Sequence, residues 1–248
     1  MNDARQDDRA AAFEQCRAEL ITYATRMVVR PDIAEELVQE AAVRLLQCEP
    51  LGSEIRDIRP WLFRVVSNLA IDHLRRHSTW KELVLVEARE RADTNPTFIA
   101  ESMELRGSPE LSAIAREHLV VCFACTLRNL NPQHAAALLM KEVHDLHTSE
   151  IAEALGASTT QVKNWLQRAR RTLQQRYAQT CALVTKEGVC HQCVELDGFF
   201  NGERRDPLEG TPRTVEARLA ILRETRERAL GPWHRRMMRL IDEVLGDQ

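Results

Sequence analysis

The sequence is poor in the residues that interrupt helices or favour strands. Its 248 residues include 9 Gly and 9 Pro, and only 5% of them are aromatic. Ala, Leu, Glu, Arg and Gln dominate instead, and these residues favour helices. No stretch shows a persuasive alternation of apolar and polar residues that would indicate a strand. The composition therefore predicts an all-α protein.

Long apolar runs are also missing. No run approaches the 18 residues that a membrane-spanning helix needs, and the N-terminal MNDARQDDRA lacks the apolar core of a signal peptide. We therefore expect a cytoplasmic protein that makes no membrane contact. In that reducing compartment the seven cysteines are expected to be core thiols, metal ligands or redox sensors rather than structural disulfides.

The chain has no large excess of either charge. The 34 Lys and Arg residues nearly balance the 37 Asp and Glu residues, which gives a formal net charge of -3. Such a chain has no strong nonspecific attraction for nucleic acid as a whole. Any DNA binding must come from local basic patches set against acidic surface elsewhere.

Helical periodicity and its breaks divide the chain into four parts. The first contains three helices, with Asp32 as the expected N-cap of the second and Pro60 as the start of the third. A polar segment with two prolines and a glycine then reads as a linker. The predicted parts are helical residues 10–77, linker 78–109, helical residues 110–177 and a C-terminal extension 178–248.

The second helical part has expected breaks at Asn131-Pro132, near Leu146-His147 and at Gly156. Its segment TSEIAEALGASTTQVKNWLQRARRTL has the spacing of a helix-turn-helix. Gly156 allows the tight turn, and Ser158 with Gln161 forms a capping box. Apolar residues recur at helical spacing and are expected to face inward, namely Ile151, Ala152, Leu155, Val162, Leu166, Ala169 and Leu173.

The opposite face of the second helix of this motif is polar and basic. Gln and Asn can pair with adenine edges, and Thr can contact a thymine methyl group. The expected base-reading set is Thr159, Thr160, Gln161, Lys163, Asn164 and Gln167, and the expected phosphate-binding set is Lys163, Arg168, Arg170, Arg171 and Arg176. A solvated basic face on a bundle helix is the alternative. The turn, the cap and the outward polar set together favour DNA binding.

Two separate blocks carry a resemblance to a known family. ELVQEAAVRLL followed by RPWLFRVVSNLAIDHLRRH resembles the second region of the extracytoplasmic-function sigma factors, and LRNLNPQHAAALLMKEVHDLHTSEIAEALGASTTQVKNWLQRARRTLQ resembles their fourth region. The resemblance covers about residues 10–177. It implies a non-enzymatic transcription initiation factor with two small helical domains. Its implied partners are core RNA polymerase and promoter DNA.

The resemblance also implies roles for individual residues. Glu36, Leu37, Val38 and Gln39 stand where the family docks on polymerase, and Glu36 replaces the usual Asp. The set implied for the minus-10 element is Arg64, Asn68, Asp72, Arg75 and Arg76, of which Asn68 and Asp72 are assigned mainly to folding and loop positioning. Trp61 is expected to pack in the core. Trp165 stands where the family often has Arg, which leaves the minus-35 sequence open.

The C-terminal extension is rich in cysteine. In TCALVTKEGVCHQC, Cys190 and Cys193 form a C-x-x-C pair, with His191 between them and Cys181 upstream. Thiolates favour Cu(I) or Zn(II) over hard ions. The extension resembles the cysteine-rich domain of copper-responsive members of the family, which implies metal sensing. A structural zinc site, a Cys190–Cys193 redox switch and uncoordinated thiols are the alternatives.

Other candidate ligands lie outside the extension. Cys122 and Cys125 share a helix face and are expected to be core thiols, with metal ligation as the alternative. His144 and His147 are expected on the surface. The final helices are amphipathic and are expected to pack on the two sigma-like blocks, the first of them through Val215, Leu219 and Leu222.

Three other functions are compatible with parts of the sequence. A stand-alone operator-binding regulator would not need the block at 33–76. A thiol oxidoreductase built on the C-x-x-C pair would need a strand-rich fold, which nothing in the sequence predicts. A sigma factor controlled by a separate anti-sigma factor would leave the extension without a sensing role.

Overall fold

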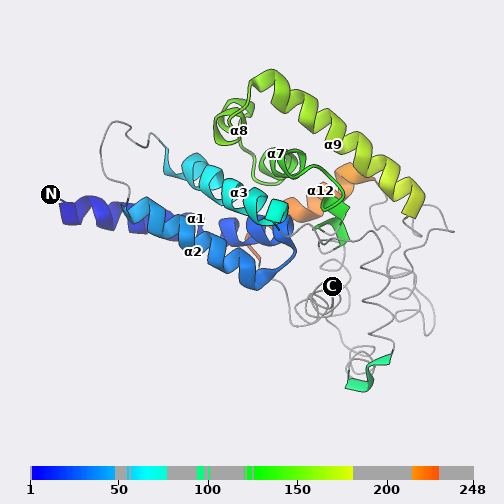
Figure 1. Ribbon diagram of the computed structural model, residues 1–248, viewed down its shortest axis with the longest axis horizontal. Coiled ribbons are helices and arrows are strands. Elements are labelled where there is room, and N and C mark those ends of the chain that lie inside the picture. The colour runs from blue at the N-terminus through cyan, green and yellow to red at the C-terminus, as the bar shows by residue number, and fades with distance from the viewer. Residues whose placement is uncertain are drawn as a thin grey trace. The chain divides into compact units, whose positions relative to one another are not determined.

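The computed structural model is built from α-helices, and the expected all-α class is confirmed (Figure 1). Every regular element among the described residues is helical. None of the helices in this part of the chain is both long and apolar enough to cross a bilayer. The structure describes residues 2–47, 55, 57–76, 94–97, 100, 120, 122–124, 126–180 and 214–228.

The first three helices pack against one another. They are α1 (Asn2–Val28), α2 (Pro31–Gln47) and α3 (Ile58–Arg76). Apolar residues at helical spacing on each of them are buried, so their helical faces meet in one core. Two buried hydroxyl groups inside this core pair with each other. The Tyr23 hydroxyl lies 2.7 Å from the Ser67 hydroxyl, and the edge of the Tyr23 ring faces Phe63 with 5.0 Å between centroids.

The start of α2 corrects one expectation. Pro31, rather than the residue after Asp32, is the first residue of this helix, so Asp32 is not its N-cap. The fixed φ and missing N–H of proline suit the first helical position. Asp32 then lies in the first turn, where a carboxylate is favoured by the helix dipole, and it forms a 3.0 Å ion pair with Arg30.

The later helices begin at the expected breaks. Asn131 caps α7 (Pro132–Glu142), because its side chain accepts a 3.0 Å hydrogen bond from the Gln133 N–H. His147 precedes α8 (Thr148–Ala154), and Gly156 separates α8 from α9 (Thr159–Thr180). The expected breaks at 131–132, 146–147 and 156 are therefore confirmed.

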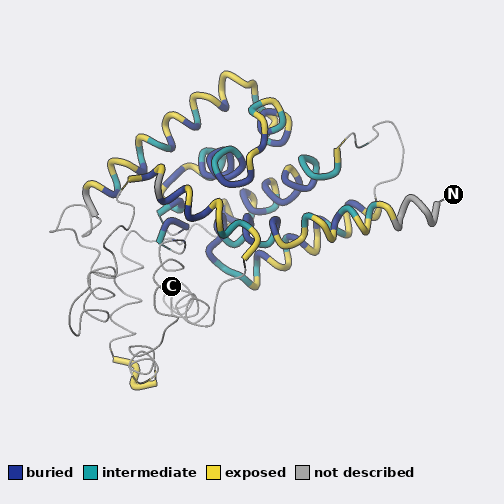
Figure 2. Tube along the Cα trace, turned by 180° about the vertical axis from the view of Figure 1, so that it is seen from behind, coloured by how far each residue is buried: buried dark blue, intermediate teal, exposed yellow. Residues whose placement is uncertain are grey.

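The chain forms two compact units that are described separately. The first contains α1, α2 and α3 together with residues 130–169 and 222–229. Within it, α3 packs against both α7 and α8, and α1 packs against α7. Figure 2 shows the buried positions of α3 and α7 as nearly continuous dark segments. The predicted four-part domain division stays a prediction.

The second unit includes residues 170–221, among which lies most of α12 (Val215–Glu224). Val215 and Leu219 are buried, as is Leu222 beyond the end of the unit, so the expected apolar stripe of this helix is confirmed. Arg218 is also fully buried. Its guanidinium lies 4.2 Å from the ring centroid of Tyr177, a cation–π contact, and 3.9 Å from the Cys122 sulfur.

Candidate nucleic-acid interface

The turn between α8 and α9 is a Schellman motif centred on Gly156. The Ala157 N–H donates to the Ala152 carbonyl over 2.8 Å, and the Gly156 N–H donates to the Glu153 carbonyl over 3.3 Å. Gly156 has φ +62°, a left-handed conformation that glycine adopts without strain. This turn fixes the direction in which α9 leaves α8, as the helix-turn-helix pattern predicts.

The start of α9 carries the predicted capping box. The Gln161 N–H donates to the Ser158 hydroxyl over 3.2 Å, and the Ser158 N–H donates to the Gln161 side-chain oxygen over 2.8 Å. Two N–H groups that the helix leaves unpaired are thereby satisfied. The amide oxygen of Gln161 accepts a hydrogen bond in the cap, whereas its NH₂ group remains as a donor for a base edge.

The two faces of α9 separate as predicted. Val162, Leu166, Ala169 and Leu173 are buried, as are Ile151 and Ala152 on α8, whereas Leu155 is half-buried. Figure 2 shows an exposed stripe that runs along α9. The exposed residues include every predicted base-reading position and two arginines, namely Thr159, Thr160, Gln161, Lys163, Asn164, Gln167, Arg168 and Arg171, while Arg170 and Arg176 are half-buried.

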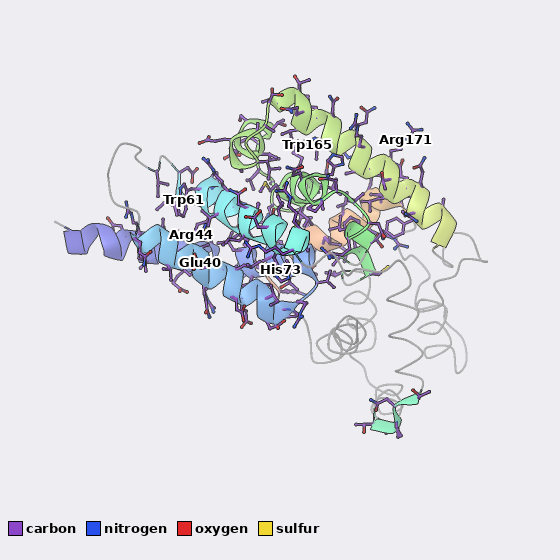
Figure 3. The ribbon with its side chains drawn as sticks, in the orientation of Figure 1. Glu40, Arg44, Trp61, His73, Trp165 and Arg171 are labelled. Atoms are coloured by element: carbon purple, nitrogen blue, oxygen red, sulfur yellow. The ribbon has the colours of Figure 1, made fainter. Side chains whose placement is uncertain are left out.

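Trp165 lies on the side of α9 that turns toward α7, whereas Arg171 projects away (Figure 3). The Trp165 ring lies 5.9 Å from the ring of His134 on α7, and both residues are half-buried. Partial burial lowers the pKa of His134, and the nearby Arg168 lowers it further. The tryptophan is therefore held between the two helices, so packing explains the residue that departs from the family pattern.

A second exposed polar surface lies on α3. The residues expected there, Arg64, Asn68, Asp72, Arg75 and Arg76, are all exposed. Asp72 and Arg75 are one helical turn apart, and the Asp72 carboxylate lies 3.8 Å from the Arg75 guanidinium. Trp61, expected in the core, is half-buried near the start of the helix (Figure 3). This face carries three arginines and one amide, which are suited to a nucleic-acid backbone, together with one carboxylate, which is not.

The expected polymerase-binding residues are divided between surface and core. Glu36 and Gln39 are exposed, Leu37 is half-buried and Val38 is buried in the core. The outer side of α2 also carries two large apolar residues, Val43 and Leu46, which are 44% and 39% exposed. On the same helix Glu40 and Arg44, both labelled in Figure 3, form a 2.8 Å ion pair.

His144, expected on the surface, is fully buried, so that prediction is wrong; His147 is exposed as expected. His144 contacts the Glu19 carboxylate through Nδ1 over 2.9 Å. Arg59 at the start of α3 binds the same carboxylate over 2.7 and 3.1 Å, and it donates to the His144 carbonyl over 2.6 Å. Rings of Tyr23 and Phe63 enclose the imidazole at 5.5 and 5.1 Å.

This buried network has perturbed pKa values. Burial alone would raise the pKa of Glu19, but hydrogen bonds from His144 and Arg59 outweigh it and lower the pKa to about 2. Burial lowers the pKa of His144 despite the neighbouring carboxylate. Glu19 and Arg59 were not predicted as a pair, because 40 residues separate them and no local pattern links them.

The candidate metal ligands Cys181, Cys190, His191 and Cys193 lie outside the described residues, as does Cys125. Within the part of the chain that the structure describes, no three His, Cys, Asp or Glu side chains cluster closely enough to hold a metal ion. Cys122 is half-buried, and its sulfur lies 3.9 Å from the Arg218 guanidinium. The metal site therefore stays a prediction.

Two segments of the chain match known protein families. Residues 12–79 match the family described as Sigma-70 region 2, and residues 121–173 match the one described as Sigma-70, region 4. Glu19 and Arg59 fall in the first match and His144 in the second. The buried network therefore joins the two matched regions.

Individual proteins show the same likeness. The ECF RNA polymerase sigma factor SigL of Mycobacterium tuberculosis is 30% identical over 169 residues, covering 66% of this chain and 85% of that protein. SigG of the same organism is 30% identical over 184 residues, covering 69% of this chain, which spans about half (49%) of SigG. The crystal structure of M. tuberculosis SigJ aligns with a TM-score of 0.42 at 25% identity, over 68% of this chain and 55% of SigJ.

Proposed function

The chain belongs to the extracytoplasmic-function sigma-70 family of transcription initiation factors, and we therefore propose that it recruits core RNA polymerase to specific promoters and starts transcription there. One observation carries this proposal. A helix-turn-helix exposes the polar N-terminal face of α9, and the same chain carries a second exposed polar face on α3. The role would be that of a binding protein in the cytoplasm and not that of an enzyme.

Region 4 would read the minus-35 element through the start of α9. The helix N-terminus adds a partial positive charge to the basic residues beside it. Asn164 and Gln167 are exposed, and neither has a capping role, so both ends of their amides are available for a base edge. Lys163, Arg168 and Arg171 are suited to phosphates.

Region 2 would act at the minus-10 element and at polymerase. Arg64, Arg75 and Arg76 on α3 are exposed and would contact the DNA backbone. On α2, the exposed Glu36 and Gln39 lie on the same helix as the apolar Val43 and Leu46. An apolar patch with a polar rim is the usual composition of a protein–protein interface. Val38 would stabilise α2 rather than touch the polymerase.

The C-terminal extension would make the activity depend on metal. Cys181, Cys190, His191 and Cys193 supply the soft ligands that Cu(I) and Zn(II) prefer. A metal can control the factor only if it binds two states of the extension with unequal affinity. A structural zinc site, with control by a separate anti-sigma factor, is the alternative.

Promoter reading is tested by Asn164→Ala, with Gln174→Ala as the matched control. Both side chains are exposed on α9, but Gln174 lies far from the N-terminal end. We expect Asn164→Ala to weaken promoter binding by about tenfold or more, because a good base contact contributes about 1–3 kcal/mol. The Gln174→Ala variant should bind like the wild type. Equal loss in both variants would contradict this docking mode.

Polymerase binding is tested by Glu36→Ala, with Glu35→Ala as the control on the same exposed stretch of α2. Weaker capture of core polymerase by the Glu36 variant alone would support the proposed docking residue. Binding of wild-type protein to promoter DNA, without any binding to core polymerase, would instead support a stand-alone regulator.

Metal control is tested by titrating Cu(I) and Zn(II) into a transcription assay under reducing conditions. Cys190→Ser and Cys193→Ser should abolish any response, whereas Cys16→Ser, in the described α1, should leave it unchanged. Transcription that is equal at every metal concentration would contradict sensing and favour the separate anti-sigma factor.

A further inference from the structure

Residues 222–228, which include the end of α12, contact both sigma regions of the first unit. Leu222, Thr225 and Arg226 bind side chains of α1, in region 2. Arg223 and Arg226 bind the turn between α7 and α8, in region 4. We name residues 222–228 the clip, because they are a segment of the C-terminal extension that touches two regions far apart in the sequence.

The contact with region 2 is made by a buried arginine. Arg26 on α1 is 3% exposed, and its Nη2 donates to the Leu222 carbonyl, the Thr225 carbonyl and the Thr225 hydroxyl, each over 3.1 Å. These oxygens lie at the C-terminal end of α12, where a helix carries partial negative charge. Burial lowers the pKa of Arg26 to about 10, so its guanidinium stays charged at neutral pH. A second contact joins the Thr22 hydroxyl to the Arg226 carbonyl.

The contact with region 4 is made by two exposed arginines. Arg223 donates to the Glu142 carbonyl over 2.9 Å and lies 3.8 Å from the carboxylates of both Glu142 and Asp145. Arg226 lies 3.4 Å from the Asp145 carboxylate. The side chains of Arg223 and Arg226 are 45% and 40% exposed, so their charges can be changed without disturbing the core.

Regions 2 and 4 also contact each other directly, without the clip. The bond from Arg59 to the His144 carbonyl joins the start of α3 to the turn before the helix-turn-helix, and Glu19 on α1 binds both residues. The clip and this network therefore bind the same two regions together. Most of the bonds in both sets are charge-assisted, and such bonds are stronger than neutral ones.

Promoter binding requires a different arrangement, and this step rests on the proposed function. Elements named minus-10 and minus-35 are about 25 base pairs apart, or about 85 Å at about 3.4 Å per base pair. In the observed arrangement Arg59 touches His144. On one side of this contact, Asn68 in the DNA-reading face of α3 lies about 14 Å along the helix from Arg59. On the other side, the chain from His144 to Thr159 at the start of α9 would span at most about 50 Å even if it were fully extended. The two DNA-reading faces therefore cannot reach both elements.

We propose that the clip holds regions 2 and 4 in a closed arrangement that restrains transcription until polymerase and promoter separate them. The clip stabilises the closed state through its contacts with α1 and with the segment from Glu142 to Asp145, and it acts by shifting the population toward that state. The C-terminal extension thereby restrains the factor from within the same polypeptide.

The test uses the full chain carrying Arg223→Glu and Arg226→Glu together. Arg228→Glu is the control for charge reversal near the same place, because Arg228 is exposed two residues beyond the second site and its replacement changes the net charge as much as one of the two replacements does. Asp145→Asn is a second opening variant on the region 4 side. Asp145 has φ +56°, a conformation that Asn also adopts, so the change removes the charge without backbone strain.

Two readouts are taken on each variant. Amide hydrogen exchange over residues 19–27 and 140–146 reports whether the regions have separated. Transcription is measured with limiting core polymerase on a template from the gene's own upstream region or on a genomic pool. The double variant should exchange faster in both segments and raise transcript yield by about threefold or more, since the ion pairs of Arg223 with Glu142 and Asp145 and of Arg226 with Asp145 are lost and replaced by repulsion. Asp145→Asn should do the same more weakly, and Arg228→Glu should match the wild type.

Three results would contradict the proposed role of the clip. Unchanged exchange in both opening variants would show that these contacts do not hold the regions together. Faster exchange with unchanged transcript yield would show that opening is not limiting. An equal effect of Arg228→Glu would assign the gain to charge alone. Failure of the proposed function looks different, because then no variant, the wild type included, binds core polymerase or gives transcripts.

Discussion

Glu19 and His144 are 125 residues apart in sequence, and their side chains meet over 2.9 Å in a buried contact. The ionised carboxylate can only accept, so the imidazole donates from Nδ1. Arg59 completes the arrangement by donating to both oxygens of the carboxylate, including Oε1, which His144 also contacts. This small network links the first three helices to the turn before the helix-turn-helix, in addition to the packing of α3 on α7 and α8, and it determines several measurable properties of the protein.

Replacing Glu19 should destabilise the first unit. In Glu19→Gln the Arg59 guanidinium loses its carboxylate partner, and breaking a buried ion pair on one side is strongly unfavourable. We expect the free energy of unfolding to fall by about 2–4 kcal/mol, at the low end of what such changes cost because Arg59 is 35% exposed. Urea denaturation at pH 7 measures this. Glu14→Gln, an exposed change on the same helix, should cost less than about 0.5 kcal/mol.

The same network predicts a loss of stability on acidification. The pKa of His144 is lowered by folding, so below about pH 6.5 the unfolded chain binds a proton that the folded chain excludes. Stability should therefore be full above pH 7 and should decline as the pH falls from 6.5 toward 5. Folding lowers the pKa of Glu19 to about 2, so below about pH 4.3 the unfolded chain binds a second proton that the folded chain excludes, and stability should decline further.

Denaturation curves from pH 7.5 to 5 measure the first decline. In His144→Gln the side chain can still donate to Glu19 but does not titrate, so the slope in this window should flatten. A slope that is the same in wild type and variant would assign the acid sensitivity to other groups.

Gly156→Ala should weaken the helix-turn-helix through the backbone alone. A Cβ at this position meets no atom within 4 Å, so there is no steric clash, but φ is +62°. An L-residue in this region costs about 1–2 kcal/mol. We expect a loss of about that size in thermal or chemical unfolding. Gly156→Asn should cost less, because Asn adopts left-handed conformations more readily, and equal costs for Ala and Asn would contradict this explanation.

Ser158→Ala should destabilise the start of α9. The change removes the hydroxyl that accepts the Gln161 N–H, and loss of such a cap costs about 1 kcal/mol. Exchange of the amide hydrogens in the first turn of α9 should become faster. Ser149→Ala, at an exposed position within α8, is the control and should leave both stability and exchange nearly unchanged. No change in the exchange of the Gln161 amide would argue against the cap.

Local signals in the sequence predicted the helix-turn-helix well. The glycine, the Ser158–Gln161 cap and the apolar spacing of α9 all act within a few residues, so they can be recognised without knowing the fold. The outward set on α9 follows from the same periodicity. The start of α2 was missed by one or two residues, because Asp32 is equally favourable as a cap and as a first-turn carboxylate.

Long-range contacts could not be predicted in this way. His144 was assigned to the surface, since nothing near it in sequence indicates that Glu19 and Arg59 bind it. Arg26 and Arg218 are buried although charged residues are usually exposed. Each is buried because distant oxygens or an aromatic ring compensate its charge, and such partners become visible only once the chain is folded.

The most direct test of the account is run-off transcription with core polymerase and the full-length protein. The templates are the gene's own upstream region and, alongside it, a pool of genomic DNA. We predict discrete transcripts that require the protein and that fall sharply with Asn164→Ala but not with Gln174→Ala. No protein-dependent transcript from either template, even with the opening variant Arg223→Glu/Arg226→Glu, would contradict the proposed role in transcription initiation.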